Sequence, residues 1–309
     1  MFDFSQTKIR CSALYSIMAS ERKKTNMELY LDACAEVIKK SEAYEKLKKK
    51  DGPRGEKLLE DMEKFDAIIP ILHAQKDVEE PLGKGAKSFL TSLYALVKYG
   101  KQSVFRDRGN KYTQKGKEAE EKSIELVSIL EGKLFTKHEG RLENEFIAGH
   151  PDIIDINDGE VTRVIDVKTP WDAESFFSVV GKDLLDQYYW QIQGYMALTG
   201  ANTGEVHFCL INHPEHQIRT ERERLLRSMN VATELNPEFV TAEKMLINNM
   251  TFDDIPLKER RIVFKVEKND EDIQKAYRQV EKCRIYLQEI EKMHLGIEDL
   301  VPLMQTDAA

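Results

Sequence analysis

The sequence contains only four cysteines, and no two of them stand at the spacing of a metal-binding pair. Zinc sites and iron–sulfur clusters usually take their ligands from closely spaced cysteines, often in Cys-x-x-Cys pairs. Here the cysteines are scattered along the chain, at Cys11, Cys34, Cys209 and Cys283. We therefore expect neither a zinc site nor an iron–sulfur cluster.

Long apolar runs are also absent from the sequence. A helix that crosses a membrane needs about 18 or more consecutive, mostly apolar residues, and no stretch of this chain approaches that length. The first residues, Met1 to Phe4, lack the pattern of a signal peptide. We therefore expect no membrane contact and a cytoplasmic location.

An excess of positive charge is missing as well, since 46 Lys and Arg face 54 Asp and Glu and the net charge is −8. Phosphate groups are bound mainly by Lys and Arg, so this balance does not by itself favour a nucleic-acid partner. The distribution of charge decides more than its sum, and basic residues gather between Lys98 and Lys117. Phosphate contact and simple solvation both remain open for that segment.

The chain of 309 residues, 41% of them hydrophobic, is long enough to bury a sizeable core. Apolar residues at helical spacing predict helices near both ends, and the centre combines helices with strands. The expected central elements are a helix at 115–131, strands near 133–138, 142–155 and 161–169, a helix at 183–199 and a strand at 204–212. We expect an α/β (α+β) fold in one integrated domain, with a helical N-terminal region (1–111), a core (112–212) and a helical C-terminal region (213–309) that includes a long helix over 269–295.

The most informative feature is a predicted hairpin in the centre. The residues around Asp166 alternate and are β-branched, as in a strand, so Asp166 and Lys168 point to the same face. A turn signature, Asn157-Asp158-Gly159, precedes this strand, and the segment Glu145 to Ile156 before the turn also has the pattern of a strand. We expect the hairpin to bring Asp152 beside Asp166.

Two carboxylates held close together repel each other, so each tends to take up a proton unless a cation lies between them. Hard oxygen ligands suit Mg²⁺ or Mn²⁺. A bound divalent ion lowers the pKa of a water molecule and orients an in-line attack on phosphorus, and Lys168 is placed to orient or deprotonate that water. The simpler alternative is that Asp166 and Lys168 form an ordinary ion pair on an exposed strand, and the Asp-x-Lys triplet alone favours this alternative.

Two further segments complete the pattern. Gly116–Glu120 opens a helix before the hairpin, and Tyr189–Leu198 forms a helix after it, with a Gln-x-Gln triplet near its start. In order and spacing, these segments and the hairpin resemble the PD-(D/E)XK nuclease superfamily. Within it, the chain looks most like the phage recombination exonucleases of the λ-exonuclease and YqaJ type. The resemblance covers residues 112–212.

The resemblance implies a restriction-endonuclease-like core, in the order helix, three-stranded mixed sheet, helix, strand. It makes Glu120 the third acid of a site in which Glu120, Asp152, Asp166 and the main-chain carbonyl of Val167 hold one or two metal ions. Lys168 then orients the attacking water. The family usually has Glu-x-Lys where this chain has Asp-x-Lys, a change that the superfamily pattern permits.

The resemblance also implies residues that contact the site or the DNA. Gln191 is expected to point at the site, with Tyr195 one helical turn further on the same face. The segment Lys8–Met18 is similar to the one with which relatives begin a helix near the DNA end, so Ser12 is a candidate for DNA contact, although a serine there is more often a helix N-cap. Trp171 can stack on a nucleobase or fill the core below the site.

Two of these residues have simpler interpretations. Glu120 lies in the charged run from Lys115 to Lys122, where most side chains form a solvated helix face, and Glu118 and Glu121 are its close neighbours. Gln191 stands between aromatic residues, where a buried amide with satisfied hydrogen bonds is also expected.

Together these observations predict a Mg²⁺-dependent exonuclease, for which Mn²⁺ is expected to substitute. The resemblance implies that its substrate is double-stranded DNA ends, degraded from 5′ to 3′ in phage or prophage recombination in a bacterial host cell. The resemblance further implies a homo-oligomeric ring around DNA and a single-strand annealing protein as partner. ATP is not expected, because Gly83–Ser88 resembles a phosphate-binding loop but breaks its required pattern.

Two alternatives remain open. The chain can be another nuclease of the same superfamily, such as an endonuclease, a junction resolvase or a RecB-type single-strand nuclease. It can also be a DNA-binding module that kept the fold without catalysis. The second alternative predicts the loss of at least one acid or of the lysine, yet all four residues are present.

Overall fold

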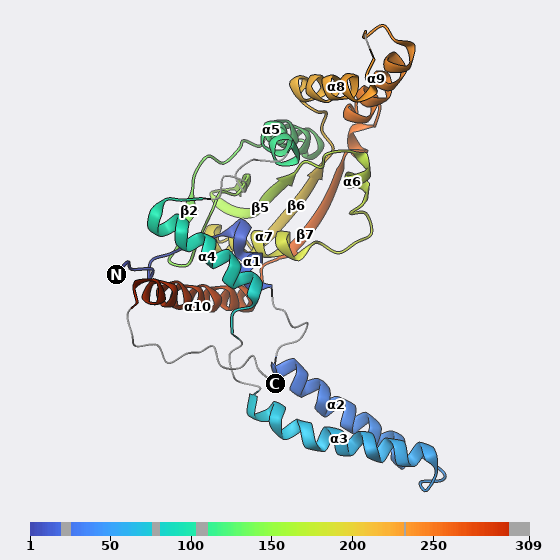
Figure 1. The fold of residues 1–309 in the computed structure, drawn as a ribbon, viewed down its shortest axis with the longest axis vertical. Helices are drawn as coiled ribbons and strands as arrows, with labels where there is room; N and C mark the ends of the chain where they lie inside the picture. The colour runs from blue at the N-terminus through green and yellow to red at the C-terminus, as the bar shows by residue number, and fades with distance from the viewer. Residues whose placement is uncertain (20–25, 76–80, 103–110, 232, 297–309) are drawn as a thin grey trace. The chain divides into compact units, whose positions relative to one another are not determined.

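The computed structural model describes residues 1–19, 26–75, 81–102, 111–231 and 233–296. Its contacts divide the chain into two compact units, one of Met1–Met18 with Ser88–Ala309 and the other of Ala19–Lys87. The smaller unit contains α2 (Asn26–Glu45) and α3 (Pro53–Gln75), which pack side by side (Figure 1). These helices confirm the helical pattern expected for this part of the chain, while the division into three regions along the sequence stays a prediction.

The larger unit is built around a four-stranded mixed sheet in the order β4-β5-β6-β7. The strands are β4 (Ile153–Asn157), β5 (Glu160–Lys168), β6 (Thr203–Cys209) and β7 (Arg261–Glu267). β5 and β6 are parallel, while β4 and β7 run antiparallel to their neighbours. In Figure 1, β5, β6 and β7 lie side by side in this order. Strand β7 was missed by the sequence analysis, which predicted only helix beyond residue 214.

A helix covers each face of this sheet. On one face, α5 (Lys111–Glu131) packs through a shared core of Ala119, Ile124, Leu126, Val127, Phe135, Ile153, Ile165, Val167, Cys209 and Ile211. On the other face, α7 (Asp186–Thr199) approaches so closely that a Cβ on Gly204 would lie 2.5 Å from Cγ1 of Ile192. Glycine at position 204 therefore permits this helix to reach the sheet.

A second, smaller sheet has the order β1-β3-β2, with β1 (Ile9–Arg10), β2 (Leu142–Glu143) and β3 (Ile147–Gly149). The single strand expected at 142–155 was therefore wrong, because these residues form three short strands in two sheets. The chain changes sheet between Gly149 and Ile153, at Pro151, whose nitrogen has no hydrogen to donate to a strand ladder.

Residues 133–138 form no strand, although one was expected there. One hydrogen bond holds this segment beside the hairpin, because the amide of His138 donates to the carbonyl of Asp152 at 2.8 Å. The segment forms no strand pairing with the hairpin. Phe135 is buried in the core while Leu134 is 84% exposed. This alternation has the period of a strand, although the segment pairs with no other strand in the described part of the chain.

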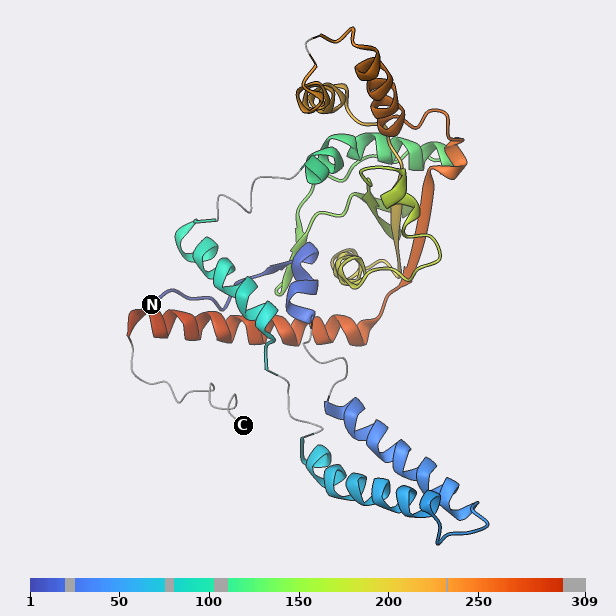
Figure 2. The ribbon, with the colours of Figure 1, turned by 45° about the vertical axis from the view of Figure 1, so that its right-hand side comes forward.

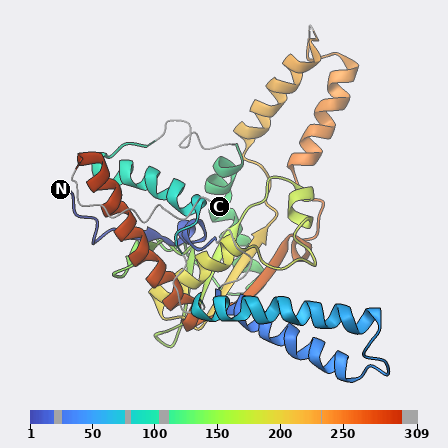
Figure 3. The same cartoon turned by 60° about the horizontal axis from the view of Figure 1, so that its bottom comes forward.

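The remaining helices and helical turns lie mostly in the larger unit. The long helix expected over 269–295 is confirmed as α10 (Asp270–Leu295), which is capped by Asn269 and lies along α1 (Leu14–Met18) (Figure 2). Short helical turns are η1 (Cys11–Ala13), α6 (Ala173–Phe177) and η2 (Leu257–Glu259), and the longer helices are α4 (Lys84–Tyr99), α8 (Glu215–Met229) and α9 (Pro237–Met250). Figure 3 shows α8 and α9, in orange, side by side.

The fold class is the one expected, a mixed α/β core with helical additions before and after it. The order helix, hairpin, helix, strand runs through α5, β4–β5, α7 and β6, and β7 adds an edge strand. Among the described residues, no helix is both long and apolar enough to cross a membrane.

Candidate active site

The two aspartates are brought together by a tight hairpin. Asp158 and Gly159 both have positive φ angles, of 52° and 83°, as a two-residue type I′ turn requires. The turn pairs Asn157 with Glu160, and a shift of one residue between Asp155 and Ile156 gives the register in which Ile153 pairs with Ile165. Continuing this register by one step places Asp152 opposite Asp166, as the sequence predicted.

Both carboxylates are held by hydrogen bonds in a largely buried position. Oδ2 of Asp152 accepts the amide hydrogen of Val167 at 2.7 Å, and Oδ1 of Asp166 accepts Nε2 of Gln191 at 3.0 Å. Burial, followed by the charge of Asp166, raises the pKa of Asp152 to about 8. At this pKa, Asp152 keeps a proton at neutral pH.

Lys168 lies directly beside this pair. Its Nζ is 2.6 Å from Oδ2 of Asp166, lies 5.0 Å from the centre of the Tyr188 ring, and donates to Oε1 of Gln191 at 3.3 Å. Burial lowers the pKa of Lys168, but the adjacent Asp166 outweighs this effect, and the net pKa is raised. Lys168 is consequently a charged group at neutral pH, suited to orient a water or phosphate oxygen.

Gln191, on α7, connects the charged groups. It donates to Asp166 and accepts from Lys168, and its Nε2 also donates to the hydroxyl of Tyr195 at 2.9 Å. Both Gln191 and Tyr195 are buried, and burial, together with the charge of Asp166, raises the pKa of Tyr195. Gln191 is thus the satisfied buried amide of the simpler interpretation, and its partners are the predicted site residues.

One oxygen of the pair lies against a charged neighbour. Oδ2 of Asp166 is buried and lies 2.6 Å from Nζ of Lys168, in an ion pair that falls outside the geometry of a regular hydrogen bond. A buried carboxylate oxygen next to a second carboxylate is also a ligand that a hard divalent cation prefers.

Glu120 reaches the neighbourhood from α5, on the opposite face of the sheet. Its Oε1 lies 3.2 Å from Nζ of Lys137, and its charge contributes to the raised pKa of Asp152. Within the described ranges, no three His, Cys, Asp or Glu side chains lie close enough together to hold a metal ion as they stand. Glu120 is therefore near the two aspartates but paired with Lys137.

Lys137 was not predicted from the sequence. Because the segment 133–138 was taken for a strand, no side chain in it was assigned to the site. The charge of Glu120 raises the pKa of Lys137, and the hydrogen bond between His138 and Asp152 fixes the chain beside the hairpin. The sequence offered one signal for a role of Lys137, namely its position between Glu120 and Asp152.

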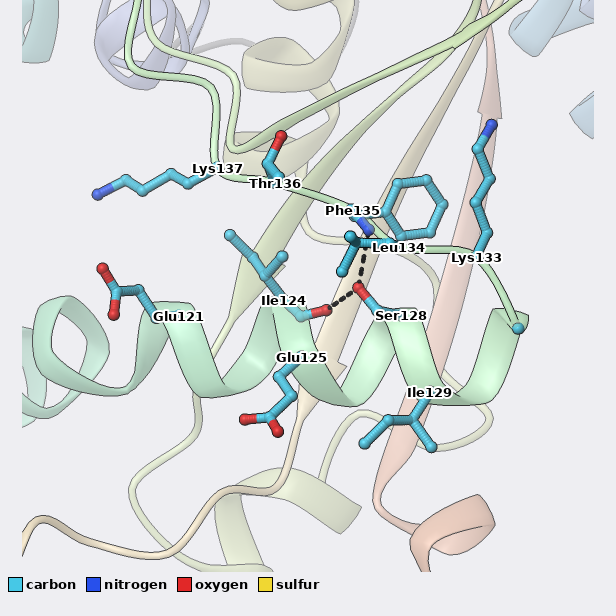
Figure 4. A pocket seen from close by; sticks show the side chains of 11 residues that line it. Glu121, Ile124, Glu125, Ser128, Ile129, Lys133, Leu134, Phe135, Thr136 and Lys137 are labelled. Carbon is cyan, nitrogen blue, oxygen red and sulfur yellow. Dashed lines mark hydrogen bonds between the residues drawn. The ribbon is translucent and has the colours of Figure 1, made fainter.

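A cavity of about 510 Å³ adjoins Lys137 but does not include the aspartates. It lies between the second half of α5 and residues 132–137, and it is lined by apolar side chains such as Ile124 and Phe135 together with charged ones such as Glu121 and Lys133 (Figure 4). Ser128 closes one wall, since its Oγ accepts the amide of Phe135 and donates to the carbonyl of Ile124.

Ser12 lies at the border of the site. It is exposed within η1, which contacts α7 and β3, and the N-cap of η1 is Arg10. Ser12 is therefore not the N-cap of this turn. Its neighbour Cys11 is packed inward, because a Cβ on Gly194 would lie 2.8 Å from the Cys11 sulfur.

The basic segment from Lys98 to Lys117 is only partly described, since residues 103–110 lie outside the described ranges. Lys98 is paired with Glu291 at 2.6 Å, and Lys115 is fully buried. These two lysines therefore have structural partners, and the phosphate-binding role proposed for the segment does not rest on them.

No family model and no curated protein matches this sequence. Among solved structures, a phage-related exonuclease from Haemophilus somnus 129PT is similar over 93% of this chain and 97% of its own, with a TM-score of 0.57 and 23% identity. The chain has the fold of this exonuclease. An alkaline exonuclease from Laribacter hongkongensis, alone and in complex with dAMP, is also similar over 69% of this chain and 86% and 87% of its own, with 17% and 16% identity and a TM-score of 0.47 in each case.

The likeness to the phage-related exonuclease confirms the resemblance at the level of the fold. Within that fold, Asp152, Asp166, Lys168 and Gln191 form one connected cluster, to which Tyr195 is hydrogen-bonded. Glu120, Ser12 and Trp171 lie outside the cluster, and the roles assigned to all of these residues stay predictions.

Proposed function

We propose that the protein is a metal-dependent deoxyribonuclease that removes nucleotides from the ends of duplex DNA. The observation that carries the proposal is the buried cluster in which Asp152 stands opposite Asp166 with the charged Lys168 beside it. The fold shared with a phage-related exonuclease supports it.

The residues present fit a divalent cation. Burial and the charge of Asp166 raise the pKa of Asp152 more than the charge of Lys168 lowers it, and Oδ2 of Asp166 is buried beside Lys168. Asp152, Asp166 and the main-chain carbonyl of Val167 would hold Mg²⁺ or Mn²⁺, with Glu120 as an additional ligand once it leaves Lys137. When bound, one or two such ions supply an activated water and stabilise negative charge on the phosphoryl group and the leaving oxygen.

The side chains of this protein then have distinct tasks. The amide of Val167 holds the Asp152 carboxylate in place, and Gln191 holds Asp166. Lys168, charged at neutral pH, orients the attacking water and offsets charge at phosphorus. The hydroxyl of Tyr195 accepts a hydrogen bond from Nε2 of Gln191 and so helps to hold that amide in place.

The finer assignment rests on the resemblance to the phage recombination exonucleases. We propose 5′ to 3′ polarity, a role in phage or prophage recombination in the bacterial cytoplasm, assembly into a ring around DNA, and cooperation with a single-strand annealing protein.

The test is digestion of a linear duplex, 5′-phosphorylated and labelled separately at each end, in Mg²⁺ or in EDTA. The wild type is expected to release mononucleotides from the 5′ end in Mg²⁺ only. Lys168→Ala is expected to lose at least 100-fold in rate, since loss of one such electrostatic contact costs about 10²–10³. Binding of the variant to DNA should persist.

A covalently closed circle separates the proposal from its alternatives. An intact circle supports the exonuclease, whereas nicking or linearisation shows an endonuclease of the same superfamily. Failure to cut linear, circular and single-stranded DNA in Mg²⁺ and in Mn²⁺ would refute the nuclease proposal and favour a DNA-binding module.

A further inference from the structure

The segment that leaves β5 runs along α5, away from the two aspartates. Oγ of Ser123 lies 2.9 Å from Oγ1 of Thr169, and Nζ of Lys115 donates to the carbonyl of Trp171 at 2.8 Å. One turn nearer the start of α5, the ring of Tyr112 contacts the ring of Trp171, with 5.1 Å between centroids. The later residues of the segment thus meet the earlier residues of the helix.

Two buried groups fix the main chain at Trp171. Lys115 is fully buried and donates to the carbonyls of both Pro170 and Trp171, at 2.7 and 2.8 Å. Nε2 of His213 lies 2.5 Å from the same Trp171 carbonyl. The backbone that carries the indole ring is consequently anchored on two sides.

Of the two rings in contact, that of Tyr112 is the more open to solvent, and that of Trp171 packs against it. Trp171 is half-buried between His213 and Tyr112, with edge-to-face angles of 79° and 74°. Tyr112, in the first turn of α5, is 53% exposed. Nζ of Lys111 lies 4.7 Å from the indole centroid and 5.7 Å from the phenol centroid, and it is 3.5 Å from Glu221.

We propose that Tyr112 is a base-stacking residue for the DNA strand that passes the two aspartates, with Trp171 as its support and Lys111 beside the adjoining phosphate. The proposal rests on the proposed nuclease function. Tyr112 precedes Glu120 by eight residues of α5, which is about 12 Å at ~1.5 Å per residue. That length equals three to four stacked nucleotides at about 3.4 Å each.

The structure favours a base over other occupants. An exposed aromatic ring with a lysine beside it accommodates the flat face of a base and its phosphate together, and the anchored Trp171 keeps the ring oriented before any ligand arrives. Stacking does not depend on base identity, because every base has a flat π face. The contact would therefore suit an enzyme that degrades DNA of any sequence.

The experiment measures binding of a fluorescein-labelled duplex with a single-stranded end, in Mg²⁺ and in the Lys168→Ala background so that the DNA survives. Tyr112→Ala is expected to weaken binding about tenfold, whereas Tyr112→Phe, which keeps the ring, should stay within about twofold of its parent. The matched control is Tyr99→Ala, since Tyr99 is 49% exposed and contacts His294. Thermal melts establish that each variant is folded.

A second arm locates the contact on the DNA. Abasic nucleotides are placed one at a time along the strand, and one position should weaken binding in the parent but not in Tyr112→Ala. Equal affinities of Tyr112→Ala and its parent, or an abasic effect that persists in Tyr112→Ala, would overturn the proposal while leaving the nuclease function intact. If the wild-type protein neither bound nor cut DNA, both the nuclease function and the stacking role of Tyr112 would be overturned. If it cut DNA but Tyr112→Ala bound DNA as its parent does, only the stacking role would be overturned.

Discussion

The carboxyl of Asp152 allows the charge balance of the site to be tested without DNA. Burial, and then the charge of Asp166, raise its pKa from the ordinary 3.8 to about 8. In the folded protein without a cation, this group keeps a proton that the unfolded chain releases. Its contribution to stability is therefore complete below pH ~4 and is lost as the pH rises through about 8, at about 1.4 kcal/mol per pH unit.

Asp152→Asn removes this pH dependence while conserving shape. The amide oxygen can still accept the amide hydrogen of Val167. Carried by Asp152 alone, the difference between the two pKa values corresponds to roughly 6 kcal/mol at pH 8. This free-energy cost belongs to the two neighbouring carboxylates together, so Asp152→Asn relieves only part of it. We expect the metal-free variant to gain on the order of 2 kcal/mol at pH 8, which raises Tm by about 4–8 °C.

The assay is thermal unfolding followed by circular dichroism, in EDTA, at pH 5 and pH 8. The matched control is Asp155→Asn on the same hairpin. Burial raises the pKa of Asp155, but hydrogen bonds from Lys133 and Arg163 outweigh it and lower the pKa. That variant should lose stability above pH ~4 and approach the wild type as the pH falls. The reasoning fails if Asp152→Asn is less stable than the wild type at pH 8, or if its gain is the same at both pH values.

Two further predictions concern the neighbours of the pair. Lys137→Met removes the cation paired with Glu120 at 3.2 Å, so Mg²⁺ affinity measured by calorimetry should rise several-fold, and a weaker affinity would show that Lys137 does not compete with the metal. Gln191→Ala removes the amide that orients Asp166 and Lys168 and should cost about 10–100-fold in metal affinity or turnover, whereas wild-type values for both would mean that the amide is only a core residue.

The hairpin was predictable because its signals are local. A turn of Asn157-Asp158-Gly159 favours positive φ at its centre, and the period of the flanking strand determines which side chains share a face. Those two facts bring Asp152 near Asp166, but the turn alone would pair Asp152 with Ile165, and the shift of one residue between Asp155 and Ile156 places it opposite Asp166. The two ends of α10 also carry local signals, namely Asn269 before the helix and Gly296 after it.

The contacts that the sequence did not reveal are non-local. Strand β7 pairs with β6 although more than fifty residues separate them, and its pattern of Ile262, Val263, Phe264 and Val266 was legible but lay in a region taken as helical. The pairing of Glu120 with Lys137 depends on which side chain a loop turns toward the helix. Alternation at Leu134 and Phe135 cannot distinguish a strand from an extended segment that only buries one aromatic ring.

Strand β5 joins the fold and the site in a single alternating run. Ile165 and Val167 face α5 and share its core, while Asp166 and Lys168, on the other face, meet Gln191 of α7. A shift of one residue in the pairing of β5 would exchange these faces. It would bury two charges against an apolar helix and turn two apolar side chains toward the amide of Gln191. The same packing that stabilises the sheet therefore selects the register in which the carboxylates meet, and the shift between Asp155 and Ile156 accommodates that register beside the two-residue turn. Glu120 differs, because it comes from the helix behind the sheet and reaches Asp152 only past Lys137.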